Sequence, residues 1–236
     1  MKNQIHIAIL LIISILIFEC GCTSNQKSQT EQADTFSVVQ EDATIEQSEN
    51  SQQVANLKEK EEIQNLIRQV LKWADSKNAI VILPMLTDSQ DCVYIGFDLN
   101  KHKSNLNKLR ATNLFAAEFI ENYNQIILTL DKKLRNHEFE KWLVGDLPTF
   151  SFANDVNPWC ACQDYPDYNP WDVKIEVIEL NNDKAQLIWK WGDVKNMHFS
   201  WKEFSYKFRT VKENGKWKIA YLQEFDFDVS TLKDGL

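Results

Sequence analysis

Apolar residues recur three and four positions apart between residues 54 and 136, and the period changes to two in the last third of the chain. The first spacing predicts a helix over residues 54–77 and a longer helical stretch over residues 106–136, with a break at Thr112. Another turn of helix is expected at residues 138–143. The apolar run at residues 79–83 fits either a short helix or a buried segment, and the stretch from 87 to 103 is predicted to be mostly loop.

Residues 173–177, 187–191, 199–208 and 217–227 alternate between apolar and polar side chains, which predicts four antiparallel strands. The alternation changes phase within the third strand, so a β-bulge is expected near Lys202 and Glu203. Asn214 and Gly215 are a strong signal for a two-residue hairpin turn. Because the helices precede the strands instead of alternating with them, the pattern indicates an α+β fold.

The segment over residues 157–171, NPWCACQDYPDYNPW, joins the predicted helices to the predicted strands. It concentrates Cys, Trp, Tyr, Pro and Asp in a short length of chain. Pro and Asp are typical of turns, so we expect a structured crossover whose ends are fixed by Trp159 and Trp171. Its composition also makes it the first place to search for a site.

The N-terminal residues are typical of an export signal. Lys2 precedes an almost unbroken apolar run over residues 5–18, which is shorter than the roughly 20 residues that a membrane-spanning helix needs. Cys22, preceded by a small residue, resembles the lipidated Cys of the bacterial lipoprotein lipobox, whereas Cys20 follows a charged residue. We predict a signal peptide over residues 1–22 and a lipid anchor to the membrane at Cys22. The alternative is an ordinary secretory signal with incidental cysteines, and both place the domain outside the cytoplasm.

Composition divides the rest of the chain into a tether and one domain. Residues 23–53 are rich in Ser, Thr, Gln, Glu, Asp and Asn, which predicts a disordered acidic tether. A single domain is expected over residues 54–230, and the 8 Trp and 13 Phe of the chain supply material for one core. The net charge of −8 argues against nucleic acid as a partner, because phosphate binding requires a basic face.

Several segments carry a resemblance to a known group of proteins: NLFAAEFIENYNQII (residues 113–127), LVGDLP (143–148), NPWCACQDYP (157–166) and GKWKIAYL (215–222). They resemble uncharacterised bacterial lipoproteins built around a domain of unknown function, within the nuclear transport factor 2-like or cystatin-like superfamily. The likeness covers about residues 57–228. It implies N-terminal helices packed on a curved four-stranded antiparallel sheet, a cystatin-like cone, and it implies no activity and no cofactor, because this superfold hosts enzymes, binding modules and scaffolds alike.

The cysteines Cys92, Cys160 and Cys162 leave several interpretations open. The two in the crossover are buried thiols, or one of them forms a disulfide with Cys92, or all three bind zinc together with His198, or the pair is redox-active. A bond between Cys160 and Cys162 is disfavoured because it closes a very small ring. Their spacing also falls short of the two to four residues usual between structural zinc ligands. The interpretations without a metal are favoured.

The crossover also carries an acidic run with the residues Asp164, Asp167, Asn169 and Asp172. These oxygens are the kind that bind calcium, but the loop with a central Gly and a terminal Glu is absent. Asp and Asn beside Pro166 and Pro170 are also what ordinary turns use. We therefore predict no metal site here.

Candidate catalytic and ligand-binding residues are few. Asp164 and His198 are a weak acid–base candidate, by analogy with superfamily enzymes that place an Asp–His or Tyr–Asp pair in the cone. Aromatic side chains in the strands and the crossover either fill the core or line a pocket, and the core is the favoured interpretation. The candidate ligand-binding residues are Trp159, Gln163, Asp164, Trp171, Trp189 and Trp191.

These observations favour a lipid-anchored, non-catalytic binding or interaction module of the bacterial cell envelope, with a small molecule or a protein as its ligand. The alternative is a small-molecule enzyme of hydrolase or isomerase type that uses the cone cavity. Protein inhibition or immunity is a third class, which the net negative charge permits.

Overall fold

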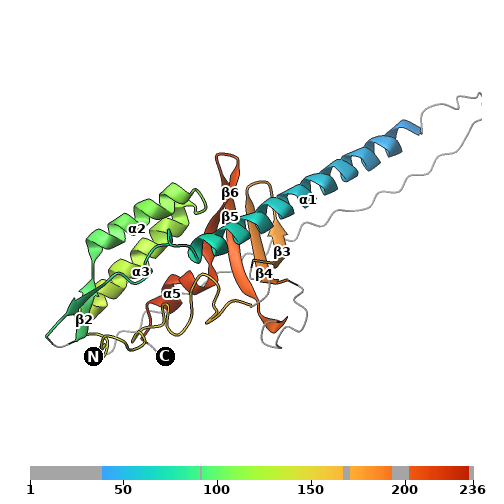
Figure 1. Cartoon of the computed structure of the whole chain (residues 1–236). Coiled ribbons are helices and arrows are strands. Elements are labelled where there is room, and N and C mark those ends of the chain that lie inside the picture. Colours follow the sequence, from blue (N-terminus) through green and yellow to red (C-terminus); the bar gives the residue numbers. More distant parts are fainter. Residues whose placement is uncertain (1–38, 91, 167–170, 193–201, 234–236) are drawn as a thin grey trace, which may run out of the picture. The chain divides into compact units, whose positions relative to one another are not determined.

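The computed structural model describes residues 39–90, 92–166, 171–192 and 202–233, and Figure 1 shows the arrangement of the elements. Two compact units divide the chain, residues 1–45 and 46–236, and the elements from β1 onward belong to the second. The elements in chain order are α1 (Val39–Ala74), β1 (Met85–Asp88), β2 (Val93–Phe97), α2 (Leu99–Thr112), α3 (Ala117–Arg135), β3 (Val173–Leu180), β4 (Lys184–Trp191), β5 (Tyr206–Glu213), β6 (Lys216–Leu222), the 3₁₀ turn η1 (Gln223–Phe225) and α5 (Phe227–Ser230). The fold is therefore α+β, as the sequence predicts.

Helix α1 begins earlier than expected, at Val39, inside the segment predicted to be a disordered tether. The predicted start of this helix at residue 54 is corrected to Val39. This stretch contains Glu, Gln and Ala but no Gly or Pro, so its sequence does not oppose a helix. The apolar stripe that predicts the later part of α1 is buried: Ile63, Leu66, Ile67, Val70 and Leu71. Residues 23–38 and the predicted signal peptide lie outside the described residues.

Helices α2 and α3 lie side by side (Figure 1), and the predicted break between them falls at residues 113–116. Asp98 caps α2 by accepting hydrogen bonds from the backbone N–H groups of Asn100 and Lys101. Thr112 ends α2 and turns the chain, because its hydroxyl donates to Leu109 O and accepts from Leu114 N. The expected helical turn at residues 138–143 is absent, and this stretch is irregular.

Strands β3 to β6 form one antiparallel sheet in the order β3-β4-β5-β6, as the alternation predicts. The turn at Asn214 and Gly215 pairs Glu213 with Lys216, and both turn residues have positive φ. The expected bulge at Lys202 and Glu203 is wrong, because these residues lie outside the strands and β5 begins only at Tyr206. Register shifts occur instead at Val177/Glu179 and at Arg209/Thr210. β6 also ends earlier than predicted, and η1 and α5 follow it.

The prediction of loop over residues 87–103 is also wrong. β1 and β2 pair as an antiparallel hairpin, and α2 starts directly after β2. Residues 142–144 continue this small sheet, because Tyr94 N donates to Trp142 O and Val144 N donates to Cys92 O. The hairpin and residues 142–144 thus form a second β layer, separate from the β3–β6 sheet.

Candidate functional site

The crossover segment is held in a tight turn by a disulfide between Cys160 and Cys162. This corrects the expectation that such a bond is disfavoured, and it excludes the pairing with Cys92, whose thiol is free and exposed. Ala161 between the two cysteines has a positive φ of 48°, and Asn157 N donates to Cys162 O at 2.9 Å. The turn brings the two cysteine Cα atoms to 5.2 Å, within the usual range for a disulfide.

Trp159 fixes the crossover to the core, as expected for one end of the segment. Its side chain is buried and packs against Trp73, Phe115 and Phe225, with ring centroids 4.8 to 5.5 Å away. The neighbouring Pro158 carbonyl accepts a hydrogen bond from the buried Tyr206 hydroxyl at 2.7 Å. The crossover therefore packs against both the helices and the sheet.

The other aromatic ligand candidates also lie in or on the core. Trp189 and Trp191 are buried and touch each other with ring centroids 4.8 Å apart. Trp171 is partly buried and lies 5.3 Å from the Tyr165 ring. The aromatic side chains of this part of the sheet therefore contribute to packing, which is the interpretation that the sequence favours.

The polar candidates of the crossover face solvent. Gln163 is exposed and donates to Asp155 at 2.9 Å, and Asp164 is exposed. His198, the proposed partner of Asp164, lies outside the described residues, as do Asp167 and Asn169 of the acidic run. Asp172 lies 3.7 Å from the Arg68 guanidinium, so its carboxylate is part of an ion pair between α1 and β3. The described polar candidates Gln163 and Asp164 are thus exposed, and Gln163 and Asp172 already have partners.

Metal binding finds no support among the described residues. Cys160 and Cys162 are oxidised to a disulfide, which removes the thiolates that zinc requires. Within the described ranges, no three His, Cys, Asp or Glu side chains lie close enough together to hold one metal ion.

A cavity lies beside the β1–β2 hairpin, and we call it the hairpin cleft. It measures about 750 Å³ and is lined by Asp88, residues 93–95, Leu134, Arg135, His137 and residues 139–142. Small-molecule sites usually measure roughly 300–1,000 Å³, so its size suits a ligand. The sequence interpretation misses this cleft because it treats the hairpin as loop. The short apolar run at residues 93–95 is the signal that could have revealed a strand.

Aromatic rings line the hairpin cleft. The ring centroids of Tyr94 and Trp142 lie 4.2 Å apart, and Trp142 packs edge-on against Phe150 at 5.3 Å. Phe139 contacts the other side of Phe150 at 5.5 Å. Trp142 is buried and its indole N–H donates to Asp146 O at 3.0 Å, while Tyr94 is only partly buried. The cleft therefore has an aromatic wall in which Tyr94 is the accessible ring of the Tyr94–Trp142 pair, and Phe139 is also only partly buried.

Asp131 holds the hairpin against α3. Its buried carboxylate accepts hydrogen bonds from Phe97 N at 2.7 Å and from Arg135 Nε at 2.9 Å. Gly96 allows this close approach, because a Cβ there would lie 2.7 Å from the Arg135 guanidinium and 2.8 Å from the Asp131 carboxylate. Position 96 also has a φ of 149°, which L side chains rarely adopt. These contacts fix one wall of the cleft.

Two of the charged side chains that line the hairpin cleft, Arg135 and Glu140, are paired. Arg135 is bound to Asp131, and Glu140 accepts a hydrogen bond from Lys233 at 2.8 Å, which lowers the pKa of Glu140. Lys141 is exposed. The cleft thus combines an aromatic wall with a nearly balanced set of charges, which suits a ligand with an apolar body better than a highly charged one.

A smaller polar pocket of about 240 Å³ lies where β6 ends. Its lining residues are Ser151, Tyr221, Gln223, Glu224, Asp226, Val229 and Ser230. Burial raises the pKa of Glu224, and the hydrogen bond from Gln223 opposes this shift. Burial, together with the nearby Asp226, raises the pKa of Tyr221 to about 12. A carboxyl group that is easier to protonate, beside hydroxyl groups, is the kind of environment in which enzymes place an acid.

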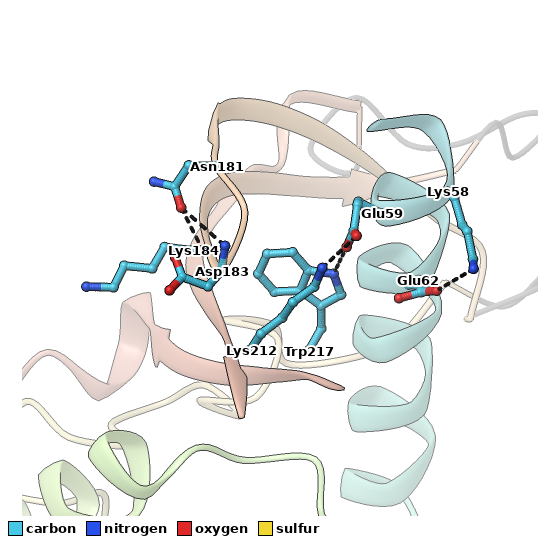
Figure 2. Close-up of polar contacts among 8 residues, drawn as sticks. All are labelled: Lys58, Glu59, Glu62, Asn181, Asp183, Lys184, Lys212 and Trp217. Carbon is cyan, nitrogen blue, oxygen red and sulfur yellow. Dashed lines mark hydrogen bonds and ion pairs between the residues drawn. The ribbon is translucent and has the colours of Figure 1, made fainter. Parts of the chain in front are cut away.

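A third cluster joins α1 to the sheet and is drawn in Figure 2. Glu59 of α1 accepts hydrogen bonds from Lys212 Nζ at 2.6 Å and from Trp217 Nε1, and the Lys212 ammonium lies 4.8 Å from the Trp217 ring centroid. Burial raises the pKa of Glu59, but these hydrogen bonds outweigh it and leave the pKa below its ordinary value. Each group has a partner, so the cluster fastens α1 to the sheet.

Comparison with known proteins adds no relative. The chain matches no protein-family model, no curated protein and no solved structure. None of the helices within the described residues has both the length and the apolar content that a membrane span requires.

Proposed function

We propose that the chain is a non-catalytic binding module that holds a small molecule with an apolar or aromatic body in the hairpin cleft. The observation that carries this proposal is the aromatic wall of Tyr94 and Trp142 beside a cavity of about 750 Å³. Aromatic rings bury large areas, and they pack favourably against a further ring in an offset or edge-to-face arrangement. Asp131 accepts hydrogen bonds from Phe97 N and Arg135 and so holds β2 against α3 without a ligand, which reduces the cost of ordering the site on binding.

We place this module at the bacterial cell envelope, anchored by lipid at Cys22. The apolar run and the lipobox-like Cys in residues 1–22 support the anchor. The disulfide between Cys160 and Cys162 gives separate support for export, because disulfides persist in oxidising compartments and are rare in the cytosol.

The cystatin-like cone is part of the same proposal. The β3-β4-β5-β6 order and the register shift at Arg209/Thr210 support a curved sheet, since such irregularities bend strands. In a cone the usual ligand space lies between helices and sheet. Here buried rings, including Trp159, Phe225 and Trp189, occupy the core, so the ligand site is moved to the hairpin.

A probe titration tests the ligand site. The neutral probe N-phenyl-1-naphthylamine is expected to bind the wild-type protein, and Tyr94→Ala is expected to weaken binding at least about tenfold by removing the accessible ring. Tyr221→Ala is the matched control, because Tyr221 is also partly buried but lines the polar pocket instead. Equal affinity of the Tyr94 variant and the wild type would remove the cleft from consideration.

A second candidate function is hydrolysis or isomerisation of a small molecule at the polar pocket. The observation that favours it is Glu224, whose burial raises its pKa beside the Tyr221 phenol. This moves the enzyme hypothesis from Asp164 and His198 to the end of β6. Assay of the wild type and of Glu224→Gln on chromogenic esters and glycosides decides the matter. Turnover that Glu224→Gln abolishes while the fold is retained supports an enzyme, and turnover that survives in this variant contradicts the assignment of Glu224.

A further inference from the structure

His102 is the one buried histidine among the described residues, and it lies where α2 meets α3. Its side chain is 2% exposed, and its ring meets the Tyr123 ring edge-on with centroids 5.2 Å apart. Nε2 lies 3.0 Å from Asn124 Oδ1, an acceptor, so Nε2 carries the proton of the neutral ring. Nδ1 is buried and has no hydrogen-bond partner among the described residues.

The same polar cluster holds the chain that leads into the hairpin. Asn105 donates to Val81 O at 2.8 Å, and the Tyr123 hydroxyl donates to Ile82 O at 2.8 Å. These two bonds fasten residues 79–84 to α2 and α3, just before β1 begins. A change in the packing of His102 is therefore expected to affect the contacts of α2, of α3 and of residues 79–84.

Protonation of Nδ1 places a charged N–H in the core with no acceptor. On α3 the ring faces the Tyr123 phenol and the Asn124 amide, and in the segment 79–84 the Val81 and Ile82 carbonyls already accept hydrogen bonds. On α2 the nearby Lys101 is exposed, and the Asp98 carboxylate caps the helix N-terminus. No carboxylate is a partner of the ring among the described residues, so nothing there compensates a positive charge.

We propose that His102 is an acid-sensitive joint, which loosens α2 and residues 79–84 from α3 when Nδ1 takes up a proton from solvent. Burial lowers the pKa of His102, and the hydrogen bond to Asn124 offsets only part of this shift. Because His102 is buried in the closed packing, the closed state binds a proton at Nδ1 less readily than the open state does. The closed packing is therefore favoured above the ordinary histidine pKa of 6.5 and is progressively lost as the pH falls below it. The inference does not depend on what the hairpin cleft binds.

Hydrogen exchange of the mature protein, compared at several pH values between 7 and 5 and corrected for the intrinsic pH dependence of exchange, tests the joint. In the wild type the opening constant of α2 amides is expected to rise by up to about tenfold per pH unit below roughly 6.5, the limit for one proton. His102→Gln keeps a donor for Asn124 but cannot take up the proton, so its α2 amides are expected to show no such rise. His137→Gln removes an exposed imidazole of the hairpin cleft, and its α2 amides are expected to keep the same rise as in the wild type.

Two outcomes would overturn the proposal. One is the same rise in His102→Gln, and the other is an equal rise in the β3–β6 sheet of the wild type, which would mean global unfolding. Burial also raises the pKa of Glu224, which follows β6. An effect of its titration on exchange is expected in the sheet peptides and not in α2. If His102→Gln does not fold, the imidazole of the wild-type protein is followed by NMR. Titration of that ring without any loss of α2 protection then counts against the joint.

Discussion

The contact between Asp131 and the backbone of β2 yields the sharpest stability prediction, because it positions the hairpin cleft. Asp131 of α3 is buried, and its carboxylate accepts a buried hydrogen bond from Phe97 N at 2.7 Å. Arg135 shares the same carboxylate but is itself 47% exposed. Asp131→Ala therefore leaves a buried backbone N–H without an acceptor, and Arg135 regains water.

The magnitude follows from these two terms. An unsatisfied buried donor costs about 1–3 kcal/mol, and a largely solvated ion pair contributes about 0.5 kcal/mol or less, so Asp131→Ala is expected to lose about 1–3.5 kcal/mol. Asp131→Asn retains an oxygen for Phe97 N but loses the charge, and about 1 kcal/mol is expected. Glu118→Ala is the control, because Glu118 is 51% exposed and lies 3.7 Å from Arg209, and it is expected to change stability by less than about 0.5 kcal/mol.

Urea unfolding followed by tryptophan fluorescence measures these differences, provided that the m-value is unchanged. Two results would refute the reasoning: a loss below about 0.5 kcal/mol for Asp131→Ala, or an equal loss for Asp131→Asn and Asp131→Ala. The second would mean that charge, and not the acceptor for Phe97 N, decides the contact.

Two further predictions concern the attachment of α1 and the cysteines. Glu59→Gln is expected to lower the free energy of unfolding by about 1 kcal/mol at neutral pH. Because the pKa of Glu59 is depressed in the folded state, the difference in stability between the variant and the wild type should disappear as the pH falls below 4.5. A stability difference that persists in acid contradicts the ion pair. Alkylation of denatured, unreduced protein that lacks residues 1–22 should label Cys92 alone, and reduction should expose Cys160 and Cys162 as well; three labelled thiols before reduction would exclude the disulfide.

Long periodic segments were predictable from the sequence because burial follows the repeat. The stripe of α1, the break at Thr112 and the Asn214–Gly215 turn all appear where the pattern places them. Short strands were not predictable: β1 has four residues and β2 has five, too few for alternation to stand out from loop. The contact of β2 with α3 uses Asp131, which lies 34 positions from Phe97, and local pattern carries no information about such a contact.

The structure of the crossover was also only partly predictable from local sequence pattern. Its Cys, Pro and Asp residues indicated turns, and turns are present. The disulfide was disfavoured because ring size was considered without the backbone, whereas the positive φ of Ala161 brings the two cysteines together. Tyr94 and Trp142 carry no comparable signal in the sequence, because they are brought together by the bridge between Val93 and Leu143, which lie far apart along the chain.

The central claim is that the hairpin cleft holds a small apolar or aromatic molecule in the cell. Native mass spectrometry of the protein, isolated from its host in mild detergent, tests this most directly and reports lipidation at the same time. We expect a bound small molecule on the wild type and on Tyr221→Ala, and its loss from Tyr94→Ala. A bound molecule that Tyr94→Ala retains and Tyr221→Ala loses would contradict the account and place the site at the end of β6.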